Sequence, residues 1–490
     1  MNNTLDEALA RTSPRLVPPP TPFASIAIHS SVMVLWFLLF ARAFFLQGVV
    51  AWSTGIAYVV YDTVLLLFVA WKARVLLAPS RAAESPAASE AKLPTLGVIV
   101  AAHNEAAVLP ITLDALFAQT RAPQQIVIAD DGSTDGTAAL LAQRYGLADP
   151  GIGQLSAPSP QYPNLRWLRL AHGGKARALN AALLALATET VMTVDADTLL
   201  EPDACAAMAG AFGRERELVA AAGLLTPVCD HTLSGRFLQW FQTYEYIRNF
   251  ISRFAWMRAD SLLLVSGAFA GFRRDAVMAV GGFDANCLVE DYELIHRLRR
   301  YSAREGLGWD VRVLGAARAR TDAPGTLASF LRQRRRWFAG FLQTQYWYRD
   351  MTGNRRYGKL GLMMLPVKAF DTVQPIYGLT AFALLIGFLF DGRFTIVLPV
   401  LGVIVGKIAI DLAFHLYSVH LYRRWSGDRT HSSFGMALLA AIFEPFSFQL
   451  MRHSGAALGW LHFLLGRRKW GVQKRAGLAA ARSRERAASQ

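Results

Sequence analysis

Residues 190–197 read TVMTVDAD, an apolar and β-branched run that ends in Asp195-Ala196-Asp197. This composition predicts a buried strand with two carboxylates directly after its end. An Asp-any-Asp triplet is frequent by chance, and in isolation a solvated loop is the ordinary interpretation. Its place after a strand favours a divalent metal site instead, because carboxylate oxygens suit Mg²⁺ and Mn²⁺. Such an ion would bridge a diphosphate and neutralise a leaving group.

Two further strands are predicted upstream. Residues 95–101 read TLGVIVA, the loop His103-Asn104-Glu105 follows, and 106–119 has helical spacing. Residues 125–129 form the next strand, which ends at Asp130-Asp131-Gly132. Strand, helix, strand predicts a parallel sheet that binds ligands beyond the carboxyl ends of its strands. Asp130 and Asp131 could form a plain acidic turn, but at this edge they, together with Glu105, are candidates for holding a base or ribose.

A lysine and a second acidic pair complete this polar set. Gly173-Gly174-Lys175 precedes a helical stretch, where a lysine is usually solvated, yet Gly-Gly beside a point charge also suits a phosphate. It lacks the glycine spacing of a P-loop. Glu290-Asp291 opens another helical stretch and could simply complement the helix dipole. In the functional interpretation, one of these carboxylates is a general base that deprotonates an acceptor hydroxyl.

The last motif is Gln333-Arg334-Arg335-Arg336-Trp337, which lies on a stretch with one apolar face. A basic amphipathic helix of this kind is typical of a membrane surface. The same helix could hold arginine near a diphosphate and tryptophan under an acceptor sugar, so the two interpretations are compatible.

Composition places part of the chain in lipid. Of the 490 residues, 53% are hydrophobic and 18% are charged. Apolar runs long enough to span a bilayer lie at both ends of the chain, at 24–47, 55–77, 373–390, 394–422 and 434–465. We therefore predict an N-terminal tail (1–23), two transmembrane helices (24–77), a linker (78–93), an α/β domain (94–330), interfacial amphipathic helices (331–372), C-terminal transmembrane helices (373–465) and a basic cytoplasmic tail (466–490).

Basic residues set the expected orientation. Lys72, Arg74 and the 332–336 cluster flank the spans, whereas the 47–54 link carries no charge. The α/β domain is thus expected on the cytoplasmic side of a multi-pass protein of the inner (plasma) membrane. Five simple spans would leave the basic tail outside. Pro445 and the Arg452-His453-Ser454-Gly455 segment therefore suggest that 434–465 is broken or re-entrant.

The net charge of +15 does not indicate a nucleic-acid partner. Eight of the basic residues lie between Arg467 and Arg486, where anionic lipid headgroups account for them, and no DNA- or RNA-binding motif is present. Cys205, Cys229 and Cys287 match no metal-ligand spacing and are expected to be reduced. Lys407, Asp411 and His415 share one face of a predicted span, either as a buried ion pair or as the lining of a glycan path.

The ordered set of Asp131, Asp195-Ala196-Asp197, Glu290-Asp291 and Gln333-Arg334-Arg335-Arg336-Trp337 resembles the membrane-integrated family 2 glycosyltransferases, which include poly-N-acetylglucosamine, chitin, hyaluronan and cellulose synthases. The resemblance implies a GT-A (nucleotide-diphospho-sugar transferase) domain of α/β class, inserted between N- and C-terminal transmembrane helices. Many relatives have Thr where this chain has Val289.

The resemblance also implies a role for each motif. Asp130, Asp131, Glu105, Lys175 and Asp195 would bind the donor. Asp197, with Asp195, would hold Mg²⁺ or Mn²⁺, and Asp291, beside Glu290, would be the base. Gln333, Arg334, Arg336 and Trp337 would close over the diphosphate and the acceptor.

These expectations converge on a metal-dependent, inverting hexosyltransferase. It would transfer sugar from a nucleotide-sugar, UDP-GlcNAc or UDP-Glc, to a growing β-linked polysaccharide, coupled to export and compatible with further secretion-complex subunits. The alternative enzyme makes a single transfer to a lipid such as ceramide, diacylglycerol or polyprenyl phosphate. A third alternative, a non-catalytic scaffold or transporter, predicts a degraded acidic motif, whereas all the acidic positions are intact.

Overall fold

The computed structural model describes residues 3–78, 93–430, 432–466 and 477–478. Its described strands form one mixed sheet in the order β3-β4-β2-β1-β5-β8-β7-β9-β6. The strands are β1 (Leu96–Ala102), β2 (Gln125–Asp131), β3 (Gln154–Leu155), β4 (Leu165–Leu170), β5 (Thr190–Asp195), β6 (Thr198–Leu200), β7 (Leu218–Val228), β8 (Phe269–Arg273) and β9 (Asp310–Asp322).

The predicted parallel arrangement is confirmed at the centre of this sheet. β1 pairs in parallel with β2 on one side and with β5 on the other. Val98, Ile99 and Val100 are fully buried, as expected for a parallel strand covered on both faces. In this register Ala102 pairs with Asp130 and Ala101 with Asp195, so both acidic motifs lie at the same edge of the sheet.

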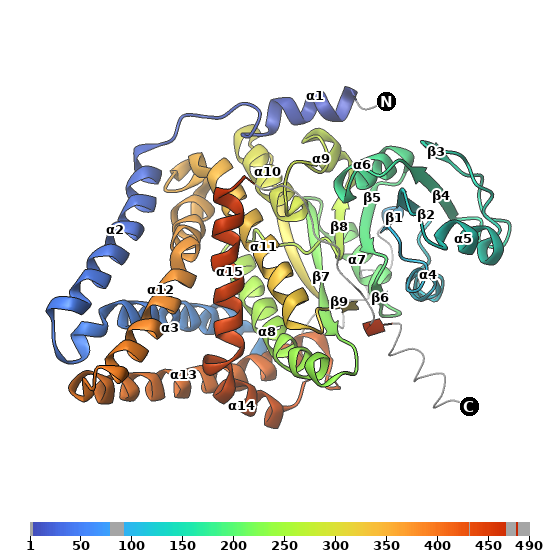
Figure 1. The fold of residues 1–490 in the computed structure, drawn as a ribbon. Helices are drawn as coiled ribbons and strands as arrows, with labels where there is room; N and C mark the ends of the chain where they lie inside the picture. The colour runs from blue at the N-terminus through green and yellow to red at the C-terminus, as the bar shows by residue number, and fades with distance from the viewer. Residues whose placement is uncertain (1–2, 79–92, 431, 467–476, 479–490) are drawn as a thin grey trace.

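Helices cover the sheet and connect it to the apolar part of the chain (Figure 1). α8 is central to this connection, because it contacts β7 and β9 as well as the apolar helices α3 and α13. The helices of the α/β part are α4 (Leu109–Phe117), α5 (Thr137–Tyr145), α6 (Lys175–Ala185), α7 (Ala204–Arg214), α8 (Leu233–Arg258), α9 (Arg274–Ala279), α10 (Glu290–Glu305) and α11 (Leu327–Trp347).

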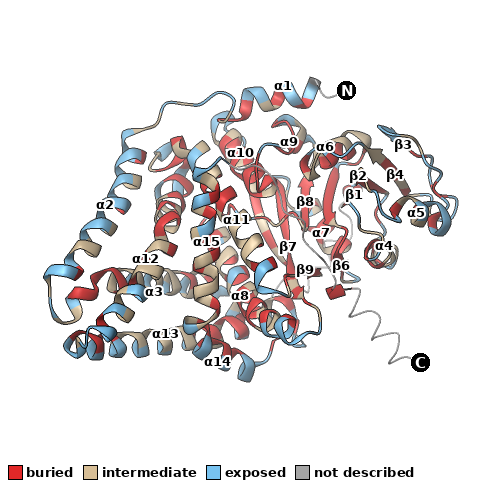
Figure 2. Cartoon of the chain, viewed as in Figure 1, coloured by how far each residue is buried: buried red, intermediate tan, exposed pale blue. Residues whose placement is uncertain are grey.

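Four described helical segments are long and apolar enough to cross a membrane, or up to five if a bent pair counts as one span. They contain α2 (Phe23–Phe45), α3 (Ser53–Ala73), α12 (Leu365–Phe390) and α13 (Phe394–Ser426). Large apolar side chains such as Phe37, Leu67 and Leu398 are exposed on them, whereas the sheet is buried (Figure 2). A soluble surface would not tolerate such continuous apolar exposure, so these helices fit a lipid environment. α12 begins earlier than the predicted span at 373.

The bent pair is the segment predicted to be broken. α14 (Phe434–Phe443) and α15 (Phe448–Leu464) meet at 50° across a short turn that contains Pro445. The second predicted break, at Arg452–Gly455, is wrong, because these residues lie within the continuous helix α15. No proline interrupts the backbone hydrogen bonds there, and α15 is supported along its length by α11.

The first 23 residues contain a helix, α1 (Asn3–Thr12), that packs on α9. Leu5 and Ala8 are buried, and Thr12 Oγ1 donates a hydrogen bond to the carbonyl of Val280 at 2.8 Å. At the other end of the chain, most of the predicted basic tail lies outside the described residues. Gly477 and Leu478 belong to the described part, and their backbone N–H groups donate to the Asp322 carboxylate at 3.2 and 2.7 Å.

Candidate active site

Lys175 connects two of the acidic motifs. Its ammonium forms an ion pair with Asp195, at the end of β5, and lies 3.9 Å from Oε1 of Glu290, at the start of α10. Burial lowers the pKa of Lys175, but the charges of Asp195 and Glu290 outweigh this effect and hold it above its ordinary value. The lysine is therefore a fixed cation between the two carboxylate sets.

The Gly-Gly turn before Lys175 is held by Asp131. Oδ1 of Asp131 accepts hydrogen bonds from the N–H groups of Gly173 and Gly174 at 2.7 and 3.1 Å. Gly174 has a φ of +96°, a backbone conformation that residues with a side chain rarely adopt. The carboxylate at the end of β2 thus fixes the turn that places Lys175 at the start of α6.

The neighbouring Asp130 makes internal contacts with both of its oxygens. Oδ1 accepts from the N–H of Ser133 at 2.9 Å, and Oδ2 accepts from the indole of Trp167 at 3.2 Å. Asp130 and Asp131 are both buried, and Glu105 lies in the loop between β1 and α4. The predicted donor-binding carboxylates therefore shape the loops at this edge of the sheet.

Two histidines join Asp131 in a cluster that the sequence analysis missed. The ligand atoms of His103, Asp131 and His172 all lie within 4.8 Å of one another, a spacing that could hold a metal ion. The two rings stack with centroids 4.4 Å apart. The sequence carried a signal for this cluster, because each histidine lies beside a predicted site motif. His103 follows the first strand, and His172 directly precedes Gly173-Gly174.

Glu290 and Asp291 occupy the first turn of α10. Asp291 Oδ2 accepts a hydrogen bond from the N–H of Gly267 at 2.6 Å, and a Cβ added at Gly267 would lie 3.1 Å from the Asp291 side chain. Glu290 is buried, and burial raises its pKa above the ordinary value because Lys175 offsets only part of the cost. Both acids are therefore part of a tightly packed site as well as of a helix N-terminus.

The basic motif lies on α11, where Arg334 has a partner that the sequence did not reveal. Its Nη1 and Nη2 donate to the two oxygens of Glu245, on α8, at 2.9 and 2.6 Å. The guanidinium also lies 4.7 Å from the ring centroids of Phe330 and Trp337. Arg334 is thus fixed on three sides.

One cavity of about 520 Å³ brings most of the predicted residues together. It continues past the α11 motif to Lys368 and Gln374 of α12 and to Arg452 and His453 of α15. Glu105, Asp130 and Asp131 are not among its lining residues. Those of the predicted residues that line it are Lys175, Asp195, Asp197, Glu290, Asp291, Gln333, Arg334, Arg336 and Trp337.

Sequence models of two related families match this chain. Glycosyl transferase family 2 matches residues 97–281, and glycosyl transferase family group 2 matches residues 190–407. Together they cover 97–407, which includes every motif described above. Residues 97–281 thus match glycosyl transferase family 2.

Named relatives and a solved structure agree with this family. A poly-β-1,6-N-acetyl-D-glucosamine synthase of Staphylococcus epidermidis is 25% identical over 284 residues, which cover 58% of this chain and 62% of the relative. The synthase of Staphylococcus aureus (strain COL) is 27% identical over 244 residues, which cover 49% and 53%. The chain thus matches less than two thirds of the length of these relatives.

A mannosyltransferase from Pyrobaculum calidifontis superposes with a TM-score of 0.53 at 21% identity, covering 81% of this chain and 99% of that one. This likeness shows that the α/β part has a GT-A fold.

The cavity has a further charged residue, Arg253 of α8. Its Nε and Nη1 atoms are buried and meet no hydrogen-bond acceptor among the residues that the structure describes. Burial lowers the pKa of Arg253 to about 10. Tyr246, Asn249, Arg253 and Trp256 recur at helical spacing and all line the cavity, so periodicity could have identified this face.

Proposed function

We propose that the protein is a membrane-embedded, inverting glycosyltransferase that adds sugar from a nucleotide-sugar to a growing β-linked polysaccharide. The cavity carries this proposal, because it joins the acidic motifs at Asp195 and Glu290, the arginine and tryptophan motif, and the apolar helices α12 and α15 in one space. The relatives named as poly-β-1,6-N-acetyl-D-glucosamine synthases favour UDP-GlcNAc as donor, with UDP-Glc as the alternative.

In this proposal the carboxylates of Asp195 and Asp197 hold Mg²⁺ or Mn²⁺. Two hard oxygen ligands that line the same cavity fit such an ion. The mannosyltransferase that shares the fold was solved with GDP-Man and Mn²⁺. When bound, the ion would neutralise charge on the departing diphosphate. The His103, Asp131 and His172 cluster does not line the cavity and suits a softer ion, so we do not assign the cofactor there.

Asp291 is the proposed general base. It takes the proton from the acceptor hydroxyl as that oxygen attacks the anomeric carbon and the bond to the diphosphate breaks. Its hydrogen bond from Gly267 fixes the carboxylate in the cavity wall. Lys175 contributes a fixed positive charge on the donor side, and Arg336 and Trp337 line the acceptor side. One displacement inverts the configuration, so an α-linked donor yields a β-linked product.

We also propose where the protein lies in the cell and where its product goes. We place the protein in the inner (plasma) membrane with its GT-A domain in the cytoplasm, which the basic residues flanking the predicted spans support. The continuation of the cavity to α12 and α15 supports transfer of the product toward the membrane, where further secretion subunits could receive it.

A second candidate function is a single transfer to a lipid acceptor. The specific observation is that Met364, Phe338 and Phe341 line the cavity alongside the candidate membrane helices. An apolar wall of this kind could seat a lipid chain next to the acceptor hydroxyl.

The test uses the full chain in nanodiscs with Mg²⁺ or Mn²⁺ and either UDP-GlcNAc or UDP-Glc. We expect UDP release together with a long polymer, and Asp291→Asn should lower both by on the order of 10²–10⁴-fold. Asp149→Asn, at a carboxylate half-exposed in a surface loop, is the matched control and should be unaffected. Products with one added sugar would assign the lipid function. Absence of turnover with every donor would contradict both.

A further inference from the structure

The membrane-side helix α15 packs unusually closely on the α11 motif. Gly455 and Gly459 face α11 four residues apart. A Cβ at Gly455 would lie 2.6 Å from Cβ of Arg334, and one at Gly459 would lie 2.8 Å from Cβ of Phe338. Small residues at this spacing allow two helices to approach backbone to backbone. The position of α15 is therefore coupled sterically to the residues around Arg334.

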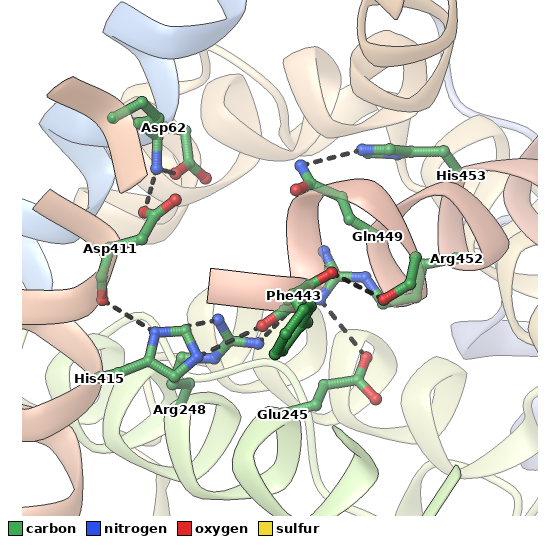
Figure 3. Close-up of polar contacts among 12 residues, drawn as sticks. Asp62, Glu245, Arg248, Asp411, His415, Phe443, Gln449, Arg452 and His453 are labelled. Carbon is green, nitrogen blue, oxygen red and sulfur yellow. Dashed lines mark hydrogen bonds and ion pairs between the residues drawn. The ribbon is translucent and has the colours of Figure 1, made fainter. Parts of the chain in front are cut away.

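A chain of charges makes a second connection between the same elements. Figure 3 shows the part of it around Glu245, Arg248 and Arg452. Glu245 holds Arg334, and Arg452 of α15 lies 3.6 Å from the same glutamate. Arg452 also lies 3.8 Å from Glu444, in the turn between α14 and α15, and Glu444 in turn binds Arg248 at 2.6 Å. Arg452 thus stands between the carboxylate that holds Arg334 and the carboxylate at the bend.

The chain of contacts continues into α3 and α13. His415 lies 3.3 Å from Glu444, and its ring interacts with the backbone carbonyl of Asp411. Lys407 forms ion pairs with Asp411 and with Asp62, which confirms the predicted Lys-Asp pair, and neither Lys407 nor Asp411 lines the cavity. Four carboxylates face four cationic groups, so the set is balanced when His415 is neutral. Removing one member leaves another charge uncompensated.

We propose that Glu245 and Arg452 are positioning residues for the α11 motif: α15 and α8 together hold Arg334, and with it Trp337, in the geometry that sugar transfer requires. Neither residue needs to touch the reacting atoms. Glu245 fixes the guanidinium, and Arg452 fixes Glu245 while linking it to the bend at Glu444. The inference deepens the proposed function and rests on it.

Removal of Glu245 should affect the position of the Arg334 guanidinium. Without Glu245, both Nη atoms of Arg334 lose their hydrogen-bond acceptor, and the guanidinium can shift within the cavity. A displacement of about 1 Å near reacting groups costs on the order of 10²-fold in rate. In the proposed function Lys175, Asp195 and Asp197 bind the donor, so the loss should fall on kcat more than on the KM for the donor.

The experiment measures kcat and donor KM for Glu245→Gln, Arg452→Gln and the double variant, each in full-length protein in nanodiscs and normalised to UDP-binding stoichiometry. We expect both single variants to lower kcat, Glu245→Gln by on the order of 10²-fold, with donor KM changed much less. Because Arg452 acts through Glu245, the double variant should lose no more than Glu245→Gln alone. Multiplicative losses would overturn the shared role.

Two further variants keep the test decisive. Glu245→Asp retains the charge and should recover part of kcat, whereas Arg452→Gln carries the test should Glu245→Gln fail to fold. Lys407→Gln, in the distant part of the same charge set, is the control: its Tm should fall while kcat stays within about twofold.

Unchanged kcat in Glu245→Gln, or in Arg452→Gln where only that variant folds, would overturn the inference while leaving the proposed function intact, provided that Asp291→Asn remains inactive. An inactive parent protein would overturn both.

Discussion

The ammonium of Lys175 lies 3.9 Å from Oε1 of Glu290 while it pairs with Asp195. This cation therefore brings together the end of β5 and the starts of α6 and α10. The charge at this point holds two mutually repelling carboxylate motifs together and provides a fixed positive group in the cavity.

Replacement of that cation should impair catalysis strongly. We expect Lys175→Met to lower kcat/KM for the donor by on the order of 10²-fold or more, because a preorganised charge near the diphosphate is lost. Lys359→Met, at an exposed lysine outside the cavity, should leave it unchanged. UDP-release kinetics for both variants provide the measurement, and equal activities would remove Lys175 from the site.

The raised pKa of Glu290 predicts a pH-dependent stability. Burial favours its protonated form, so the stabilising contribution is full below the unfolded value near 4.5 and is lost as pH rises through the higher folded pKa. Glutamine resembles the protonated acid and carries no charge at either pH. The free energy of unfolding of Glu290→Gln should therefore fall less far below that of the parent at pH 7 than at pH 4. Thermal unfolding of both proteins across this range checks the sign, and the opposite slope would contradict it.

Arg253 should show a trade-off between stability and activity. Nε and Nη1 of this guanidinium are buried and meet no acceptor among the described residues, so its removal is expected to raise stability by about 1 kcal/mol. The same change should lower turnover, since a guanidinium in the cavity can bind an anionic substrate group. Tm and UDP release of Arg253→Met, compared with Arg258→Met at an exposed position of the same helix, separate these effects. A lower Tm with full activity would argue for a structural arginine.

The close approach of α15 to α11 makes Gly455 sensitive to size. Gly455→Ala should destabilise the protein by about 1–3 kcal/mol, because the new methyl group overlaps the Arg334 side chain. Gly406→Ala, in α13, meets no atom within 4 Å and should be tolerated. The measurement is the denaturation midpoint of both variants in the same detergent. Equal midpoints for Gly455→Ala and Gly406→Ala would refute the prediction.

The proposed metal site gives a separate test. Chelation should abolish turnover, with recovery on addition of Mg²⁺ or Mn²⁺, and Asp197→Asn should need a higher metal concentration for half-maximal rate. His172→Gln should leave that concentration unchanged, since His172 lies outside the cavity lining. A shift in His172→Gln rather than in Asp197→Asn would move the ion to the histidine cluster.

Local pattern was sufficient to predict the centre of the fold. The buried strands at 96–102, 125–131 and 190–195 follow from their apolar runs, and their parallel order follows from the intervening helices. The acidic motifs then had to share one edge of the sheet. The same logic predicted the apolar helices and the bend at Pro445, because proline and long apolar runs act through the backbone and the solvent nearby.

Tertiary packing decided what those motifs touch. Glu245 meets Arg334 from 89 residues away, and nothing in the periodicity of either helix identifies the other as its partner. Neighbouring elements likewise decide that α1 docks on α9, that α15 continues through Arg452–Gly455 and that Arg253 lines the cavity. The sequence by itself determined at which strand and helix ends the candidate site residues lie. Only the tertiary structure decided which charges neutralise one another, because that depends on distances between segments that local preferences do not control.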